Sequence, residues 1–332
     1  MADTYATKGL PAPPDVSIKT IPMAGLLVDV YGLDELTPNM PTSCLWLLHP
    51  RTQTRARMHD IARRTIAAWS ARNTKRGLIA LSFDMPNHGT RLVSESANLA
   101  WDGGNDTHAI DMFGMVKGGV ADMSGLMDLV AGYIGREVQG HVCLGWSLGG
   151  HSAWQAFFGE RRIDAAVAVI GCPDFASLLS DRAAQANLDC GAEFVGSKYF
   201  PKDLVETCAL HDPKTLLFGT SPIPSSISTA EKTRLGAILD ARVRGKKLLL
   251  CSGGDDKLVP YANSKPFATF LKEAVSEGGW YEGGAEVDDR VYEGIGHKFS
   301  ADMVEDAVRF LVDAVEKGPR GKGQRSVEKS VL

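Results

Sequence analysis

Short runs of entirely apolar residues, separated by longer segments with helical spacing, limit how this chain can fold more than any other feature. The runs at 45–48, 167–170 and 248–250 contain no polar side chain. A strand that is apolar at every position is covered on both faces, which is typical of a parallel sheet flanked by helices. The alternation of such runs with helical segments therefore predicts an α/β domain built on a mostly parallel sheet.

Eight strands and five core helices are expected from this alternation. The predicted strands span residues 16–21, 26–31, 43–49, 78–83, 141–145, 165–171, 247–252 and 287–292. The predicted core helices span residues 56–72, a long part of 107–134, 148–158, 264–275 and 301–315. We therefore expect an eight-stranded sheet with helices on its faces.

Residues 175–244 interrupt this rhythm, because they contain no convincing strand. Helical patterns at 178–184 and 230–242 flank a proline-rich stretch, and a structureless loop of this length is uncommon within a domain. We expect a helical cap, or lid, inserted into the core; the alternative is an irregular surface excursion. The expected organisation is an N-terminal arm, a core in two parts, the cap and a flexible basic tail: 1–15, 16–174 with 245–316, 175–244, and 317–332.

The composition excludes several classes of protein. The 332 residues include 36 basic and 40 acidic side chains, a net charge of −4, so no basic surface for nucleic acid is expected. The six cysteines form no CxxC pair, and no metal-ligand cluster or dinucleotide motif has suitable spacing, so we expect neither metal nor cofactor. No signal peptide is visible and no run approaches the roughly 18 apolar residues of a membrane helix, so we expect a cytoplasmic protein without a membrane span. Its oligomeric state is not predicted.

Residues 145–150 read Gly-Trp-Ser-Leu-Gly-Gly, and this Gly-x-Ser-x-Gly pattern lies between a predicted strand and a predicted helix. A strand–Ser–helix turn forces Ser147 into a strained backbone that lifts its hydroxyl out of the sheet edge. Glycines two positions before and after the serine leave room for so tight a turn. Amides at the start of the next helix can stabilise an oxyanion. Ser147 is therefore the candidate nucleophile; the alternative is an ordinary glycine-rich turn.

A serine nucleophile needs a base and an orienting carboxylate, which follow it in the order acid, then histidine, in a fold of this kind. Residues 253–260 (Gly-Gly-Asp-Asp-Lys-Leu-Val-Pro) follow one predicted strand, and residues 293–300 (Glu-Gly-Ile-Gly-His-Lys-Phe-Ser) follow another. Both loops are expected at the same sheet edge as Ser147, so His297 is the candidate base. Three carboxylates are candidates for the acid: Asp174, Asp255 and Asp256.

These motifs and their order resemble the α/β-hydrolase superfamily over roughly residues 40–312. Its members often read Gly-x-x-Asp-x-x-Val-Pro at the acid and Gly-x-Gly-His at the base. The resemblance implies a triad of Ser147, Asp256 and His297, with Asp256 counted back from the Val-Pro pair. It also places the insertion at 175–244 where members of the superfamily carry lids.

The resemblance further implies where an oxyanion is bound. The N–H of Leu148, directly after the nucleophile, is the first expected donor. Members commonly have His-Gly at the strand end where this chain has His49 and Pro50. Because proline has no N–H, the second donor is expected to be the N–H of Arg51. His49 and Trp146 are the candidates for the substrate pocket.

The function indicated by these residues is hydrolysis of a small carboxylic ester, or of an amide or thioester, through an acyl-enzyme on Ser147. Two other classes remain open because a fold alone does not fix a reaction. One is the same fold with non-hydrolytic chemistry, as a lyase or acyltransferase. The other is a non-catalytic ligand-binding protein of the same fold.

Overall fold

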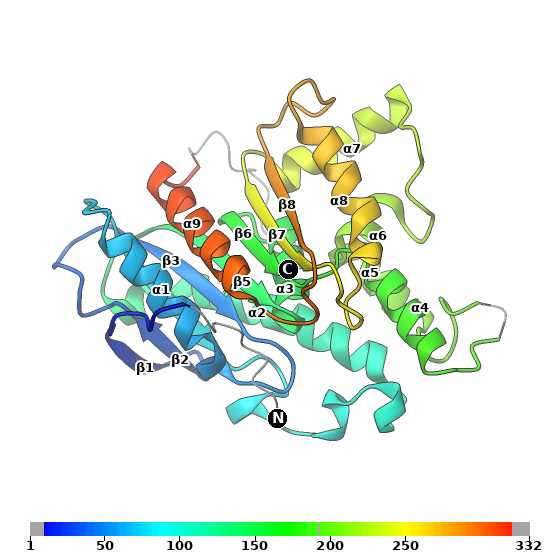
Figure 1. Cartoon of the computed structure of the whole chain (residues 1–332), viewed down its shortest axis with the longest axis horizontal. Coiled ribbons are helices and arrows are strands. Elements are labelled where there is room, and N and C mark those ends of the chain that lie inside the picture. The colour runs from blue at the N-terminus through cyan, green and yellow to red at the C-terminus, as the bar shows by residue number, and fades with distance from the viewer. Residues whose placement is uncertain (1–9, 192, 321–332) are drawn as a thin grey trace.

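The computed structural model describes residues 10–191 and 193–320, and an eight-stranded sheet runs through its centre (Figure 1). The strands are β1 (Ile18–Met23), β2 (Leu26–Tyr31), β3 (Thr42–Leu48), β4 (Gly77–Phe83), β5 (Val138–Trp146), β6 (Ile163–Val169), β7 (Lys247–Gly253) and β8 (Glu286–Tyr292). Their order across the sheet is β1-β2-β4-β3-β5-β6-β7-β8. β2 pairs with β1 and β4 in antiparallel fashion, and the pairs from β4 to β8 are parallel.

The eight-stranded, mostly parallel sheet expected from the apolar runs is confirmed. β3, β4 and β6 are buried at every residue, as their apolar sequences require. β8 reads Glu-Val-Asp-Asp-Arg-Val-Tyr, lies at one edge of the sheet and is only partly buried. An edge strand tolerates such charges because it is covered less than a central one.

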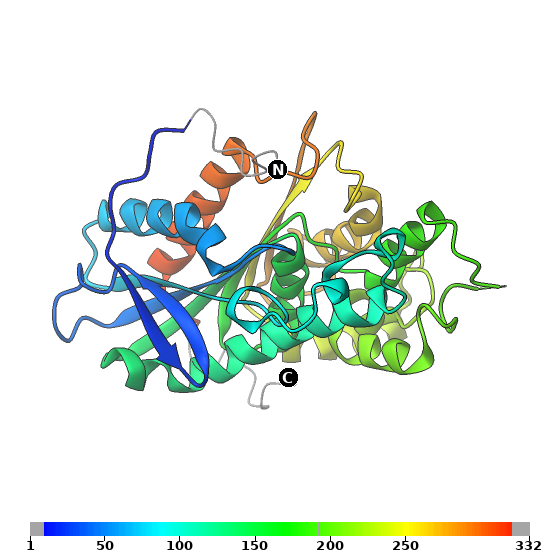
Figure 2. The same cartoon turned by 90° about the horizontal axis from the view of Figure 1, so that it is seen from below.

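Helices cover both faces of the sheet, as Figures 1 and 2 show from two directions. On one face, α1 (His59–Ser70) packs against α9 (Ala301–Lys317). On the other face, α2 (His108–Ile134) packs against α3 (Leu148–Gly159), and α8 (Tyr261–Val275) lies against β8. Short 3-10 turns occur at Arg55–Met58, Gly89–Arg91, Ser96–Asn98 and Trp101–Gly103. Within the residues that the structure describes, no helix has the length and apolar character needed to cross a membrane.

Several predicted boundaries are wrong by a few residues. β6 ends at Val169 and not at residue 171, because Ile170 has a φ of +53°, outside the extended region. β5 begins at Val138, three residues before the predicted start at 141. The predicted helix at 56–72 is divided into a 3-10 turn and α1.

The described part of the segment 175–244 contains four helices, of which two were expected. They are α4 (Phe175–Gln185), α5 (Lys202–His211), α6 (Pro213–Phe218) and α7 (Thr229–Val243). Pro201 precedes α5 and Pro213 is the first residue of α6. Proline is tolerated at the start of a helix, where its missing N–H has no helical partner. α5, α6 and α7 all contact α3, so this segment packs on the core at the end of the molecule drawn on the right of Figure 1.

Candidate active site

Ser147 forms the turn between β5 and α3, with φ of 55° and ψ of −110°. Its N–H donates to the carbonyl of Val169 at 2.9 Å. A Cβ on Gly145 would lie 1.7 Å from the carbonyl oxygen of Gly149, and a Cβ on Gly149 would lie 2.0 Å from that of Leu48. No side chain fits at either glycine. The surrounding backbone therefore holds the serine in a conformation that a non-glycine residue seldom adopts.

The candidate nucleophile, base and acid meet at the carboxyl edge of the sheet. Ser147 follows β5, Asp256 follows β7 and His297 follows β8. Ser147 Oγ lies 2.9 Å from His297 Nε2. Nδ1 of the same imidazole lies 2.8 Å from Asp256 Oδ2. This is the arrangement in which an imidazole can take a proton from a serine while a carboxylate fixes its orientation.

Asp256 is held firmly in the position that meets the imidazole. Its side chain is fully buried, and its Oδ1 accepts hydrogen bonds from the N–H groups of Leu258 at 2.8 Å and Val259 at 2.9 Å. Asp255, the neighbouring alternative, is exposed. Asp174, the third alternative, caps α4 by accepting the N–H of Ser177. The geometry therefore favours Asp256 among the three carboxylates considered from the sequence.

The end of β3 lies beside the nucleophile turn, since the carbonyl of Leu48 leaves no room for a side chain at Gly149. The loop after β3 therefore begins next to Ser147. Leu148 is the first residue of α3, and the first N–H groups of a helix have no partner within it. Arg51 follows Leu48 by three residues in the same loop. The binding of an oxyanion by the Leu148 and Arg51 amides stays a prediction.

His49 and Trp146 are both buried in the structure. His49 Nε2 accepts the N–H of Met85 at 2.9 Å, so its Nδ1 carries the hydrogen that bonds the Pro50 carbonyl at 2.8 Å. Burial lowers the pKa of His49 to about 4. The Trp146 ring lies 5.9 Å from that of Phe299. His49 thus ties the loops after β3 and β4 together, and a role in substrate binding stays a prediction for both residues.

A small pocket that the sequence did not reveal lies next to the acid loop. Its volume is about 150 Å³, and its walls include Arg51, Trp101, Asp102, His108, Arg182 and Leu258. Leu258 links it to the candidate triad, since its N–H donates to Asp256. Arg182 lies on α4. From the sequence alone, a charged residue on such a helix is expected to face solvent. No motif marked it, because only the folded chain brings it to this pocket.

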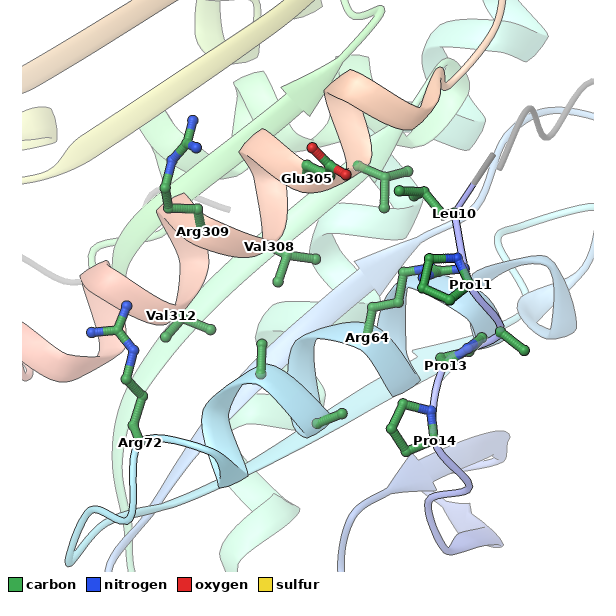
Figure 3. A pocket seen from close by; sticks show the side chains of 14 residues that line it. Leu10, Pro11, Pro13, Pro14, Arg64, Arg72, Glu305, Val308, Arg309 and Val312 are labelled. Carbon is green, nitrogen blue, oxygen red and sulfur yellow. The ribbon is translucent and has the colours of Figure 1, made fainter. Parts of the chain in front are cut away.

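A larger hollow of about 460 Å³ lies elsewhere, between the N-terminal segment, α1 and α9 (Figure 3). Pro11, Pro13 and Pro14 form one side, and Val308 and Val312 of α9 face them. None of the triad residues lines it. In the described ranges 10–191 and 193–320, no group of three or more His, Cys, Asp or Glu side chains is placed to hold a metal ion.

Comparisons with known proteins identify the fold. The sequence profile described as "Alpha/beta hydrolase family" matches residues 44–314. Similar solved structures include TT1662 from Thermus thermophilus, which is 20% identical with a TM-score of 0.54 and aligns over 91% of this chain and 99% of its own. Est1E from Butyrivibrio proteoclasticus, solved with ferulic acid, is 16% identical with a TM-score of 0.50 over 90% and 99%. An S-formylglutathione hydrolase from Agrobacterium tumefaciens is 16% identical with a TM-score of 0.51 over 90% and 94%. A search of curated protein sequences finds no match.

Proposed function

Because the chain belongs to the alpha/beta hydrolase family, we propose that it is a serine hydrolase that cleaves a carboxylic ester through an acyl-enzyme on Ser147. The observation that carries this proposal is the continuous hydrogen-bonded path from Ser147 Oγ through His297 to Asp256. The strained serine turn supports it, since such strain persists only where the surrounding structure enforces it.

The reaction proceeds in two halves that use the same three side chains. His297 Nε2 takes the hydroxyl proton while Ser147 Oγ attacks the ester carbonyl, and the imidazolium then protonates the departing alcohol. In the second half, His297 activates a water molecule, which releases the acid and frees the serine. Asp256 keeps the imidazole in the tautomer with hydrogen on Nδ1 and stabilises its cation.

The N–H groups of Leu148 and Arg51 are the proposed donors to the oxyanion that forms in each half. The helices of 175–244 are the proposed cap, which would supply apolar surface to the acyl chain. Among solved structures with this fold, one was determined with ferulic acid bound and another is named an S-formylglutathione hydrolase. These names agree with esters as the first substrates to test and with thioesters as the second.

An active-site probe tests the proposal directly. We expect a fluorophosphonate to label Ser147, as read by mass spectrometry of the peptide, and Ser147→Ala to abolish labelling. A panel of 4-nitrophenyl esters should then show turnover that disappears in the same variant. Labelling without ester turnover would point to acyl transfer or lyase chemistry. Absence of both, in a folded protein, would support a ligand-binding role and overturn the proposal.

A further inference from the structure

The pocket beside the triad contains two guanidinium groups that lie far apart in the sequence. Arg51 comes from the loop after β3, and Arg182 comes from α4. Among the described residues, neither group has a carboxylate within ion-pair distance, and Nη1 of Arg51 is buried without a hydrogen-bond partner. Other arginines of this chain, such as Arg162 and Arg55, sit directly on carboxylates. Both arginines are half-buried, and they lack the anion that cations withdrawn from water usually have.

The partners of Arg182 are neutral. Its Nε and Nη2 donate to the carbonyl of Leu258 at 3.3 and 3.0 Å, and its Nη1 lies 3.2 Å from the sulfur of Met112. Burial, and then the charge of Arg51, lower the pKa of Arg182 to about 10. Burial also lowers the pKa of Arg51. Two partly desolvated cations that act on each other reduce stability unless an anion lies with them.

The remaining groups around the pocket do not supply that anion. Asp102 is exposed at the rim and acts on Arg51 electrostatically without forming an ion pair with it. Burial, with Arg51 and Arg182 nearby, lowers the pKa of His108 to about 3, so this imidazole is neutral near pH 7. Asp256 acts on Arg182 as well, but its oxygens are engaged by His297 and two main-chain amides. The pocket therefore keeps a positive charge.

A single residue connects this charge to the reacting groups. The N–H of Leu258 donates to Asp256, and the carbonyl of Leu258 accepts from Arg182. A volume of about 150 Å³ is small for a ligand site and suits a carboxylate with a few carbons. Guanidinium groups bind carboxylates through paired hydrogen bonds of fixed geometry. We propose that Arg51 and Arg182 bind a carboxylate of the substrate, so that the preferred substrates are esters carrying a negative charge near the scissile bond; this inference rests on the proposed ester hydrolysis.

The test compares charged and neutral esters that match in length. One arm uses the mono-4-nitrophenyl esters of adipate, pimelate and suberate against 4-nitrophenyl hexanoate, heptanoate and octanoate, corrected for spontaneous hydrolysis. A second arm puts the charge on the alcohol side, with the butyryl ester of 4-hydroxybenzoate against phenyl butyrate. In the arm whose charge reaches the pocket, we expect kcat/KM to favour the charged ester by at least about 10-fold, as charge-assisted hydrogen bonds allow.

The measured quantity is kcat/KM for the charged ester divided by kcat/KM for the neutral ester. Substitutions at different residues of the pocket should shift this ratio in opposite directions. Arg51→Leu, which keeps the main-chain N–H, and Arg182→Gln, which keeps a donor for Leu258, should each bring the ratio toward one. Asp102→Asn removes the competing rim carboxylate and should raise the ratio. Arg72 follows α1 and forms exposed ion pairs with Asp313 and Glu316 of α9, so Arg72→Leu removes a positive charge away from the pocket and should leave the ratio unchanged.

The outcomes separate this inference from the function on which it rests. Neutral esters hydrolysed without a preference for charge in either arm would overturn the carboxylate pocket and leave the serine hydrolase intact. A preference that survives both arginine substitutions would also overturn it, because the charge would then be recognised elsewhere. Hydrolysis of none of the esters would overturn the proposed function and this inference together.

Discussion

The parallel strands of the central sheet begin at one edge, the amino edge, and end at the other, the carboxyl edge. Charged side chains are withdrawn from solvent at both, but their partners differ. At the amino edge, Lys246 precedes β7 and Glu160 precedes β6, and both are fully buried. Lys246 Nζ donates to the carbonyls of Phe157 at 2.7 Å and Glu160 at 2.9 Å. The Glu160 carboxylate accepts hydrogen bonds from Arg162 and Ser124. The protein itself supplies hydrogen-bond partners to both side chains.

At the carboxyl edge, by contrast, two positive side chains lack a partner of opposite charge among the described residues. The Ser147 turn is strained, and Arg51 and Arg182 have no carboxylate partner among the described residues. Burying charge without full compensation reduces stability, so it is retained where it serves binding or reaction. We infer that the amino edge stabilises the fold while the carboxyl edge carries the chemistry. This division can be tested by variants that separate loss of activity from loss of stability.

The largest effect is expected from the nucleophile and the base. Ser147→Ala and His297→Ala should each lower kcat/KM for a neutral ester by about 10³-fold or more, because the two groups act as one unit. For the same reason the double variant should lose little beyond either single variant. Steady-state kinetics give the losses, and urea unfolding should show that all three proteins remain folded. Losses that simply multiply would contradict the assignment.

The acid should show a similar contrast between neighbours. Asp256→Asn preserves the shape of the side chain but removes the charge that stabilises the imidazolium, so kcat should fall by about 10²-fold or more. Asp255→Asn changes an exposed side chain and serves as the matched control. The reverse order of effects would assign the acid to Asp255.

Substitution at the amino edge should have the opposite signature. Burial alone would raise the pKa of Glu160, but hydrogen bonds from Arg162 and Ser124 outweigh it and hold the pKa at about 2. Glu160→Gln removes this charge from its partners and should lower the free energy of unfolding by about 2–4 kcal/mol. The exposed Glu137→Gln should change it by less than about 0.5 kcal/mol. Ester kcat/KM should hardly change in either variant. A large loss of kcat/KM in folded Glu160→Gln would contradict the separation of stability at the amino edge from chemistry at the carboxyl edge.

The last effect concerns Lys246 and appears only as a dependence of stability on pH. Burial, followed by the charge of Arg320, lowers the pKa of Lys246 from 10.5 to about 7. Between pH 7 and 10.5 the unfolded chain therefore binds more protons at this lysine than the folded chain does, so stability should rise with pH in this window. In Lys246→Met this contribution is absent. Urea unfolding at pH 7, 8.5 and 10 gives the free energy of unfolding of both proteins. The value for the wild type should rise relative to that for the variant as the pH rises, whereas a constant difference would contradict the lowered pKa.

Much of the sheet could be predicted from the sequence, because apolar strands and the turns that end them are local signals. The residues that meet at Ser147 lie where the motifs put them, although their role in catalysis stays a prediction. The helices α5 and α6 were missed, because Pro201 and Pro213 were assigned only to a proline-rich stretch between two helices, whereas they mark helix starts. Arg182 could not be found either, since its neighbours Met112 and Leu258 are 70 and 76 residues away in the chain.

The positions of the three residues along the chain also determine when during synthesis the proposed triad can be assembled. The strand that carries Ser147 lies within the sheet, whereas His297 comes from the loop after the edge strand β8. The histidine is made 150 residues after the serine and 41 residues after Asp256. A nascent or truncated chain that stops before β8 has the nucleophile and the acid but no base. The proposed activity is therefore coupled to completion of the sheet, and we expect unfinished chains to be inert towards esters.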